Sequence, residues 1–293
     1  MPIYRYEPVR PPLALSTTIE CFWRLLMPST PPPDEMLAAD GRAAMLFQFE
    51  GRSQAIVPMS HTPFACTTSW IVRPYAHALR VQQVGVSASA MIGVRFAPGG
   101  WAAFQHAIPI GDDSYPLNIL SDFFTPPNIR ALEGRLYDTL YTPRWAAPLI
   151  DYFTRYLHPP LYADLIAHAV RILERCETSI PALAHQVNLS ERQFTRVFRD
   201  LVGLPPKQFA RIARMRRVLY QPQRADNLLT LQQIARHHGY HDDAHLAHEF
   251  RHLVGMSPSQ YFTGVHALIA QENPNDDRFL QLEDNTMIVS SEP

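Results

Sequence analysis

The chain has 293 residues, and its 26 lysines and arginines nearly balance its 27 aspartates and glutamates, giving a net charge of −1. Its three cysteines are odd in number and share no short spacing, which argues against a disulfide framework and a zinc ribbon. The N-terminus has no apolar signal core, and no apolar run in the chain reaches transmembrane length, so we expect a cytoplasmic protein with no membrane partner. The chain is long enough for two domains.

The first 125 residues are predicted to form a β-rich domain, because strand-like apolar runs alternate there with small and turn-forming residues. The predicted strands span residues 45–49, 81–86 and 90–96. The last strand leads through Gly99 and Gly100 into a helix that starts at Trp101. We expect both glycines to supply the positive φ of the turn. An anion cradle at the helix start is the alternative.

Candidate chemistry in this domain is limited. A cupin-like barrel would take histidine ligands for a metal, and the candidates are His61, His77 and His106. No His-x-His followed by a carboxylate accompanies them, so we favour structural histidines and predict no metal and no cofactor. No motif for a catalytic serine, a phosphate-binding loop or a Cys–His pair is evident, so no catalytic residue is predicted. Large aromatic residues either wall a ligand pocket or, as we favour, fill the core: Trp23, Trp70 and Trp101.

Residues 126–160 are predicted to form a helical connector. Leucines and aromatic residues recur there at helical spacing on two stripes that prolines separate. The first stripe comprises Leu132, Leu136, Tyr137 and Leu140, and the second Leu149, Ile150, Phe153 and Leu157. Two interpretations stay open, which are packing against the β-rich domain and a two-fold contact in a homodimer.

An internal repeat marks the segment 161–270. Residues 198–209, FRDLVGLPPKQF, recur as residues 250–261, FRHLVGMSPSQY, at a constant offset of 52. A repeat of this length indicates that one supersecondary unit occurs twice. Such a pair suits a periodic partner, and double-stranded DNA offers a major-groove face once per turn of roughly 34 Å.

Each copy is predicted to be two short helices joined by a tight turn. In the first copy an apolar stripe that ends at Val187 is followed by Asn188, which tolerates a left-handed backbone. Ser190, with Gln193 three residues later, predicts the cap of a second helix, which ends at Gly203. In the second copy the turn, the cap and the helix end are predicted at Gly239, Asp242 and Gly255. This arrangement is a helix-turn-helix.

The face opposite each apolar stripe is the candidate DNA-binding surface. In the first copy it comprises Ser190, Arg192, Thr195, Arg196 and Arg199. Guanidinium and hydroxyl groups on one stripe suit hydrogen bonding to guanine edges and phosphates. In the second copy it comprises Ala244, Ala247, His248 and Arg251. Because this face has fewer polar groups, we expect the first motif to read bases and the second mainly to dock.

Histidines crowd the second copy at a spacing that would suit a metal: His237, His238, His241, His245, His248 and His252. No cysteine or carboxylate completes a site, so we favour helix caps, partial burial and phosphate contacts. Charge is also divided unevenly. Residues 161–270 carry a surplus of +4, residues 1–160 balance to zero, and the tail 271–293 carries −5. The surplus suits site-specific binding better than nonspecific coating of DNA, and we expect the acidic tail to be disordered.

Residues 161–262 resemble the DNA-binding domain of AraC/XylS-type bacterial transcription regulators. The resemblance rests on both motifs, the longer second turn, the G-x-x-P-x-Q-[FY] that closes each unit, and a joining helix over 209–219. It implies that Arg192, Thr195 and Arg196 face bases in the first motif, and that Asp243, Ala244, Ala247 and His248 hold those positions in the second. The segment GVRFAPGG, residues 93–100, is similar to sensor domains that precede such modules.

The predicted fold class is therefore α+β. A β-rich sensor domain (1–125), with a cupin-like barrel as one option, precedes the helical connector (126–160), an all-α domain with two helix-turn-helix motifs (161–270), and the acidic tail (271–293). The predicted function is sequence-specific transcription regulation, modulated by a small-molecule effector or a partner, with RNA polymerase as a further partner of an activator. The alternatives are an enzyme in residues 1–125 with the helical module as a targeting unit, and an adaptor whose repeat binds protein.

Overall fold

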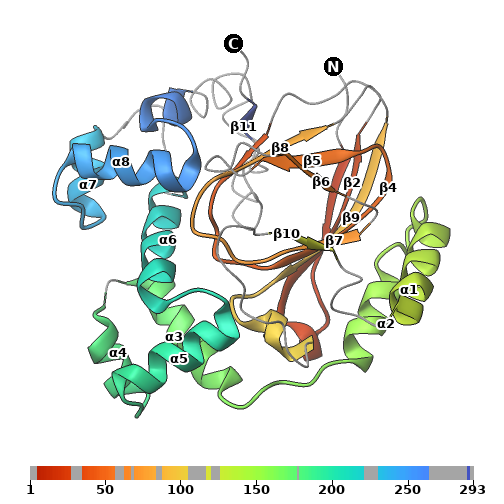
Figure 1. The fold of residues 1–293 in the computed structure, drawn as a ribbon, viewed down its shortest axis with the longest axis horizontal. Helices are drawn as coiled ribbons and strands as arrows, with labels where there is room; N and C mark the ends of the chain where they lie inside the picture. The colour runs from red at the N-terminus through yellow and green to blue at the C-terminus, as the bar shows by residue number, and fades with distance from the viewer. Residues whose placement is uncertain are drawn as a thin grey trace.

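The computed structural model describes residues 5–27, 35–56, 63–66, 69–83, 88–104, 117–119, 126–176, 178–220, 230–263 and 289–290. Within these ranges a β domain precedes two helices that lie against it, and a separate group of helices carries the two predicted motifs (Figure 1). The predicted α+β class with an all-α C-terminal domain is confirmed. No helix of the described ranges is long and apolar enough to span a membrane.

The β domain consists of two antiparallel sheets. The first has the strand order β1-β2-β9-β4-β7-β10 and the second β11-β3-β8-β5-β6. The strands are β1 (Arg5–Val9), β2 (Ile19–Met27), β3 (Glu35–Leu37), β4 (Ala44–Glu50), β5 (Ser53–Ile56), β6 (Pro63–Cys66), β7 (Ser69–Val72), β8 (Leu79–Gln83), β9 (Ser89–Phe96), β10 (Leu117–Ile119) and β11 (Val289–Ser290). The three predicted strands correspond to β4, β8 and β9, while residues 84–86 of the second predicted strand lie outside the described ranges.

The pairing follows one long nested hairpin. β5 pairs with β6, β4 with β7, β3 with β8, and β2 with β9, while β4·β9 and β5·β8 contacts join the nested pairs into two sheets. This is the double-sheet jelly roll, an architecture that cupins share. β9 lies between β2 and β4, and every one of its residues is buried. A strand buried on both faces explains why this segment is mostly apolar. Arg95, its one charged residue, is buried in ion pairs with Glu20 and Asp40.

The turn after β9 confirms one glycine prediction and corrects the other. Gly99 has φ +82°, as predicted, whereas Gly100 does not have a positive φ. A Cβ at Gly100 would lie 2.0 Å from the carbonyl oxygen of Thr18, so this glycine is required for close approach of two backbones. The segment predicted to start a helix at Trp101 forms a single 3-10 turn over Gly100–Phe104.

The connector contains α1 (Pro126–Thr139) and α2 (Ala147–Arg155). Its leucine and phenylalanine stripes are buried in the same core cluster as the strand residues Phe22, Phe47 and Phe96. The packing interpretation is therefore confirmed for these stripes. Tyr137 is the exception, since 63% of its surface is exposed, and a homodimer contact there stays a prediction.

The described residues of the C-terminal domain form six further helices (Figure 1). They are α3 (Ala163–Arg175), α4 (Ile180–Gln186), α5 (Glu191–Val202), α6 (Pro206–Leu219), α7 (Leu231–His237) and α8 (Asp243–Val254). The pairs α4–α5 and α7–α8 correspond to the two predicted motifs, and α6 joins them. Of the predicted acidic tail, only Val289 and Ser290 are among the described residues, and they pair with β3.

The second motif shares its core with the β domain. One buried cluster combines Trp70 and Leu79 of the sheets with Phe250 and Tyr261 of the second motif. Two backbone hydrogen bonds reinforce the contact: Ala39 N–H donates to the Leu253 carbonyl (2.8 Å) and Ala78 N–H to the His252 carbonyl (3.0 Å). The β domain thus supplies donors to the last turn of α8, whose carbonyls have no partner within the helix.

Candidate nucleic-acid interface

The first motif has the predicted turn geometry. Asn188 is left-handed with φ 56°, and Ser190 Oγ accepts a hydrogen bond from the Gln193 N–H (3.3 Å), so it caps α5. Gly203 ends α5 with φ 86°. The predicted turn at Asn188, the predicted cap at Ser190 and the predicted helix end at Gly203 are therefore confirmed. The turn places α5 across α4, as in a helix-turn-helix.

The second motif follows the same plan. Gly239 has φ 70°, Asp242 Oδ1 accepts from the His245 N–H (2.7 Å), and Gly255 ends α8 with φ 84°. Sequence reasoning missed the capping box at the start of α7, where Thr230 and Gln233 exchange two hydrogen bonds. The T-x-x-Q spacing was the available signal.

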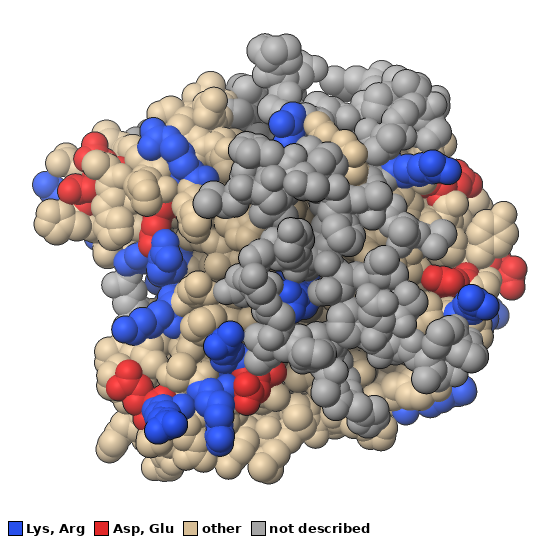
Figure 2. All heavy atoms as spheres, viewed as in Figure 1, with Lys and Arg blue, Asp and Glu red and all other residues tan. Residues whose placement is uncertain are grey.

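The predicted stripe of α5 faces solvent. Arg192, Arg196 and Arg199 are exposed and Thr195 is half-buried, while the opposite face is buried. Figure 2 shows basic side chains gathered over the helical domain, with acidic side chains interspersed among them. Three guanidinium groups on one solvent-facing stripe of a capped helix can donate to base edges and phosphates together.

The face of α8 is less polar. Ala244, His248 and Arg251 are exposed and Ala247 is half-buried. Asp243 is also exposed, next to the capping Asp242, whose pKa is lowered by the His245 backbone N–H and by His241. The structure thus places all the predicted DNA-binding residues on the outer faces of α5 and α8 or at the α5 cap, while their contacts with DNA stay a prediction.

Sequence reasoning missed Glu249, a buried acid on the inner side of α8 with 3% of its surface exposed. Arg211 and Arg214 of α6 pair with its carboxylate. Burial acts to raise the pKa of Glu249, but these two arginines hold it below its usual value, so the carboxylate is charged. The only sequence signal was an acid where the first copy has the apolar Val197.

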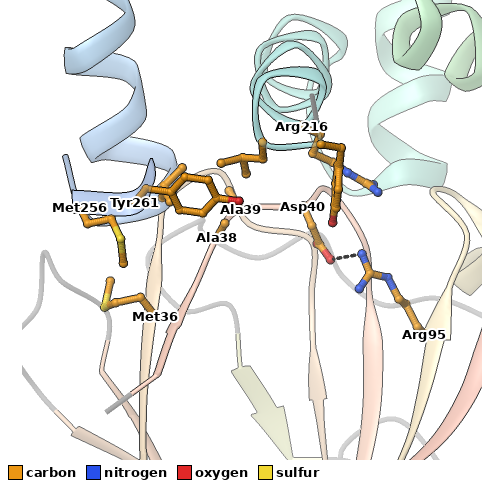
Figure 3. Close-up of a pocket in the computed structure, with 11 residues that line it drawn as sticks. Met36, Ala38, Ala39, Asp40, Arg95, Arg216, Met256 and Tyr261 are labelled. Atoms are coloured by element: carbon orange, nitrogen blue, oxygen red, sulfur yellow. Dashed lines mark ion pairs between the residues drawn. The ribbon is translucent and has the colours of Figure 1, made fainter. Parts of the chain in front are cut away.

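A small cavity lies where the β domain meets the second motif (Figure 3). Its lining includes charged and aromatic groups from both domains, and its interior offers about 30 Å³, room for one or two waters. Arg95 pairs with Asp40 (3.0 Å) at its floor, and Arg216 of α6 stacks over Tyr220 (5.3 Å between guanidinium and ring centre). Burial raises the pKa of Tyr220, so its hydroxyl stays protonated.

The predicted metal candidates divide between described and undescribed residues. His61 and His106 lie outside the described ranges, and the ring of His77 is tilted against that of Tyr75 (6.1 Å between ring centres). Among the residues that the structure describes, no three His, Cys, Asp or Glu side chains converge to hold a metal. Of the crowded histidines in the second motif, His238 is buried and the others are exposed. Trp70 and Trp101 are buried and Trp23 packs partly buried, as the core interpretation predicts.

Two family models match the chain. Residues 183–264 match a model described as a helix-turn-helix domain, and residues 7–112 match one described as a domain of unknown function. The first match spans both motifs and α6, and the second spans most of the β domain. No curated protein matches the chain.

Two solved structures are similar to the chain. ToxT from Vibrio cholerae, with an unsaturated fatty acid bound, is 9% identical over 82% of this chain and 94% of ToxT, with a TM-score of 0.45. The DNA-binding domain of AdpA, in complex with a target DNA, is 26% identical over 39% of this chain and 96% of that domain, with a TM-score of 0.30.

The paired motifs and the family match define the class: the chain is a DNA-binding transcription regulator. Its C-terminal domain belongs to the AraC-type helix-turn-helix family, which confirms the resemblance in the sequence.

Proposed function

We propose that the two recognition helices have unequal roles, with α5 reading the sequence of the operator and α8 docking on its backbone. The observation that carries this proposal is the solvent-facing stripe of Arg192, Arg196 and Arg199 on α5. An arginine fork can donate two hydrogen bonds to O6 and N7 of one guanine, which is the most common specific contact in the major groove. Thr195, on the same stripe, can contact a base edge or a thymine methyl group.

The docking role of α8 rests on what its outer face lacks. Ala244 and Ala247 offer only methyl contacts, while His248 and Arg251 can donate to phosphate oxygens. Asp243 repels phosphate and leaves the first turn of α8 less suited to close approach. A motif with these groups contributes affinity and register rather than sequence preference.

The β domain is the proposed sensor, because it contacts the DNA-binding domain directly. Arg42 pairs with Glu20 of β2 (2.6 Å) and with Glu174 at the end of α3 (2.8 Å), so one arginine joins the two domains. A small effector that binds at the junction would change the position of the motifs through these contacts. A partner on the exposed connector, such as a second copy or RNA polymerase, would act from the opposite side.

The test is the substitution Arg196→Ala. Loss of a bidentate base contact should weaken binding to the selected operator by about 1–3 kcal/mol and relax the preference at one position of the site. Operators are first selected from random duplexes with the unmodified chain, and affinities are then measured at fixed salt. Arg144→Ala, which removes an exposed arginine of the connector, is the matched control.

Equal weakening on the operator and on random DNA would contradict base reading by Arg196 and assign it to phosphate. If the unmodified chain selected no sequence at all, the proposed function itself would be wrong. A connector variant as weak as Arg196→Ala would show that the effect comes from net charge.

A further inference from the structure

The two copies of the repeat differ at one buried position of the recognition helix. At the offset of 52, Val197 of α5 corresponds to Glu249 of α8. Val197 is buried in an apolar cluster, as expected for the inner face of such a helix. Glu249 is buried as well, with 3% of its surface exposed, although burying a carboxylate is costly unless it is paired. The carboxylate of Glu249 therefore has to be paired within the folded domain.

The carboxylate of Glu249 is held from two directions by α6. Arg211 Nε donates to Oε1 (2.6 Å), and Arg214 Nη2 donates to Oε2 (3.2 Å). Arg214 also reaches the Gly239 carbonyl in the turn between α7 and α8 (3.4 Å), and its guanidinium lies 4.3 Å from the ring centre of Tyr240. One arginine of α6 thus contacts the turn, the recognition helix and the aromatic residue between them.

Helix α6 also contacts the first half of the domain, through Arg217, which lies about one helical turn beyond Arg214. Arg217 Nη1 donates to the carbonyls of Leu173 (3.0 Å) and Glu174 (3.1 Å), the last turn of α3. Helix α3 packs in one cluster with α4 and α5. Helix α6 is therefore a spacer with arginine contacts toward each motif, and the orientation of α8 relative to α5 depends on both sets.

A buried ion pair fixes the relative orientation of the elements that it joins more than it stabilises the fold. Replacing such a pair by apolar residues of similar volume is often neutral for stability, because desolvation offsets the attraction. Its hydrogen bonds, in contrast, have a narrow geometry that apolar contacts lack. Two recognition helices can occupy successive major-groove faces only when their separation and angle match the helical repeat of DNA, about 34 Å.

We propose that Glu249 is a positioning residue, which through Arg211 and Arg214 fixes α8 against α6 and so sets the half-site spacing at which both motifs bind DNA. This inference rests on the proposed function, in which α5 and α8 bind one operator. Glu249 faces away from DNA, so it acts only through the placement of α8.

The experiment compares Glu249→Gln with the unmodified chain on a series of operators. The operator selected by the unmodified chain is lengthened between its halves by about 2 and 5 base pairs, a fifth and half of a helical turn. The unmodified chain should lose about tenfold or more in affinity with the longer insertion, since α8 then meets the wrong face. Glu249→Gln should bind the original operator more weakly, and its affinity should change less than about threefold across the series.

Two controls separate positioning from charge and folding. Asp138→Asn removes one exposed negative charge from α1 and should keep the spacing dependence of the unmodified chain. Glu249→Asp keeps the carboxylate and should restore part of that dependence. Should Glu249→Gln unfold, the double variant Glu249→Val with Arg214→Met, in which the valine copies Val197 of the first motif, takes its place in the same series.

A variant without the ion pair that keeps the full spacing dependence would overturn the proposal. Loss of binding to an isolated half-site read by α5 would overturn it as well, because the effect would then not be confined to α8. Failure of the unmodified chain to select any operator would contradict the proposed function itself, so the two failures are distinguishable.

Discussion

His238 is a buried residue at the end of α7, with 8% of its surface exposed. Burial, the neighbouring His237 and Arg217 lower its pKa from 6.5 to about 4. The folded chain therefore keeps this ring neutral where the unfolded chain would protonate it. Between pH 6.5 and 4 folding releases a proton, so stability is complete above this window and is lost as the pH falls through it.

We accordingly predict that His238→Gln makes the stability of the domain less dependent on pH between 6.5 and 4. In the unmodified chain, the His238 ring should lower the free energy of unfolding by at most about 3 kcal/mol as the pH falls through this window, which is the free energy that corresponds to its pKa shift. The measurement is the free energy of unfolding by urea at a series of pH values. His168→Gln, at an exposed position of α3, should keep the full slope, and an unchanged slope in His238→Gln would contradict the assignment.

Single residues divide into those that the sequence predicts and those that it does not. The caps Ser190 and Asp242 and the left-handed Asn188 were predictable, because each acts within four residues of itself. The roles of Glu249 and Gly100 were not predictable. The arginines that pair with Glu249 lie 35 or more positions away in the sequence, and the backbone that approaches Gly100 belongs to the segment before β2. Local chemistry is visible in a sequence, whereas long-range contacts depend on the fold.

The two recognition helices differ at the scale of whole elements. Both begin at a side-chain cap, have twelve residues and end at a glycine, yet their outer faces differ in charge and polarity. The apolar period that defines both helices is read directly from the sequence. Which face is available for DNA is also predictable, since the buried stripe leaves only the opposite side exposed. The contacts of α8 with the β domain were not predictable from that period.

The docking role of α8 predicts a specific effect of Arg251→Ala. Loss of a phosphate contact should weaken binding by a similar factor on the selected operator and on random DNA. It should also lower the slope of log affinity against log salt by about 0.9, the value for one neutralised phosphate. Binding is measured at four or more salt concentrations for Arg251→Ala and, for comparison, Arg192→Ala.

Arg192→Ala is expected to lose more on the operator than on random DNA, because α5 is the proposed reading helix. If Arg251→Ala changed sequence preference more than Arg192→Ala does, the roles of the two helices would be reversed.

At the scale of the whole molecule, the strand order of the β domain is the feature that sequence reasoning missed most. Three strands were predicted, but their neighbours were not. The pair β2·β9 joins residues about seventy positions apart, and the burial of β9 depends on both of its neighbours. Alternating patterns locate a strand, whereas only the assembled sheet decides its partners. The same limit explains why the contact between the β domain and the second motif was not foreseen.

That contact predicts how the chain unfolds. Since Trp70 and Leu79 share a buried cluster with Phe250 and Tyr261, neither domain can lose its structure without exposing apolar surface of the other. The described domains should therefore unfold in one cooperative thermal transition, with calorimetric and van't Hoff enthalpies that agree. Two resolved transitions in the unmodified chain would contradict this coupling.

Ala78→Glu should separate the two transitions. Ala78 has 1% of its surface exposed, and its N–H donates to the last turn of α8 beside Gly255. A carboxylate there would be buried without a partner, at a cost of about 2–4 kcal/mol to the contact between the domains. Ala131→Glu adds the same charge at an exposed position of α1 and should keep a single transition. If Ala78→Glu also unfolded in one transition at an unchanged midpoint, the junction would not couple the domains, and a signal from the β domain to α8 would need another route.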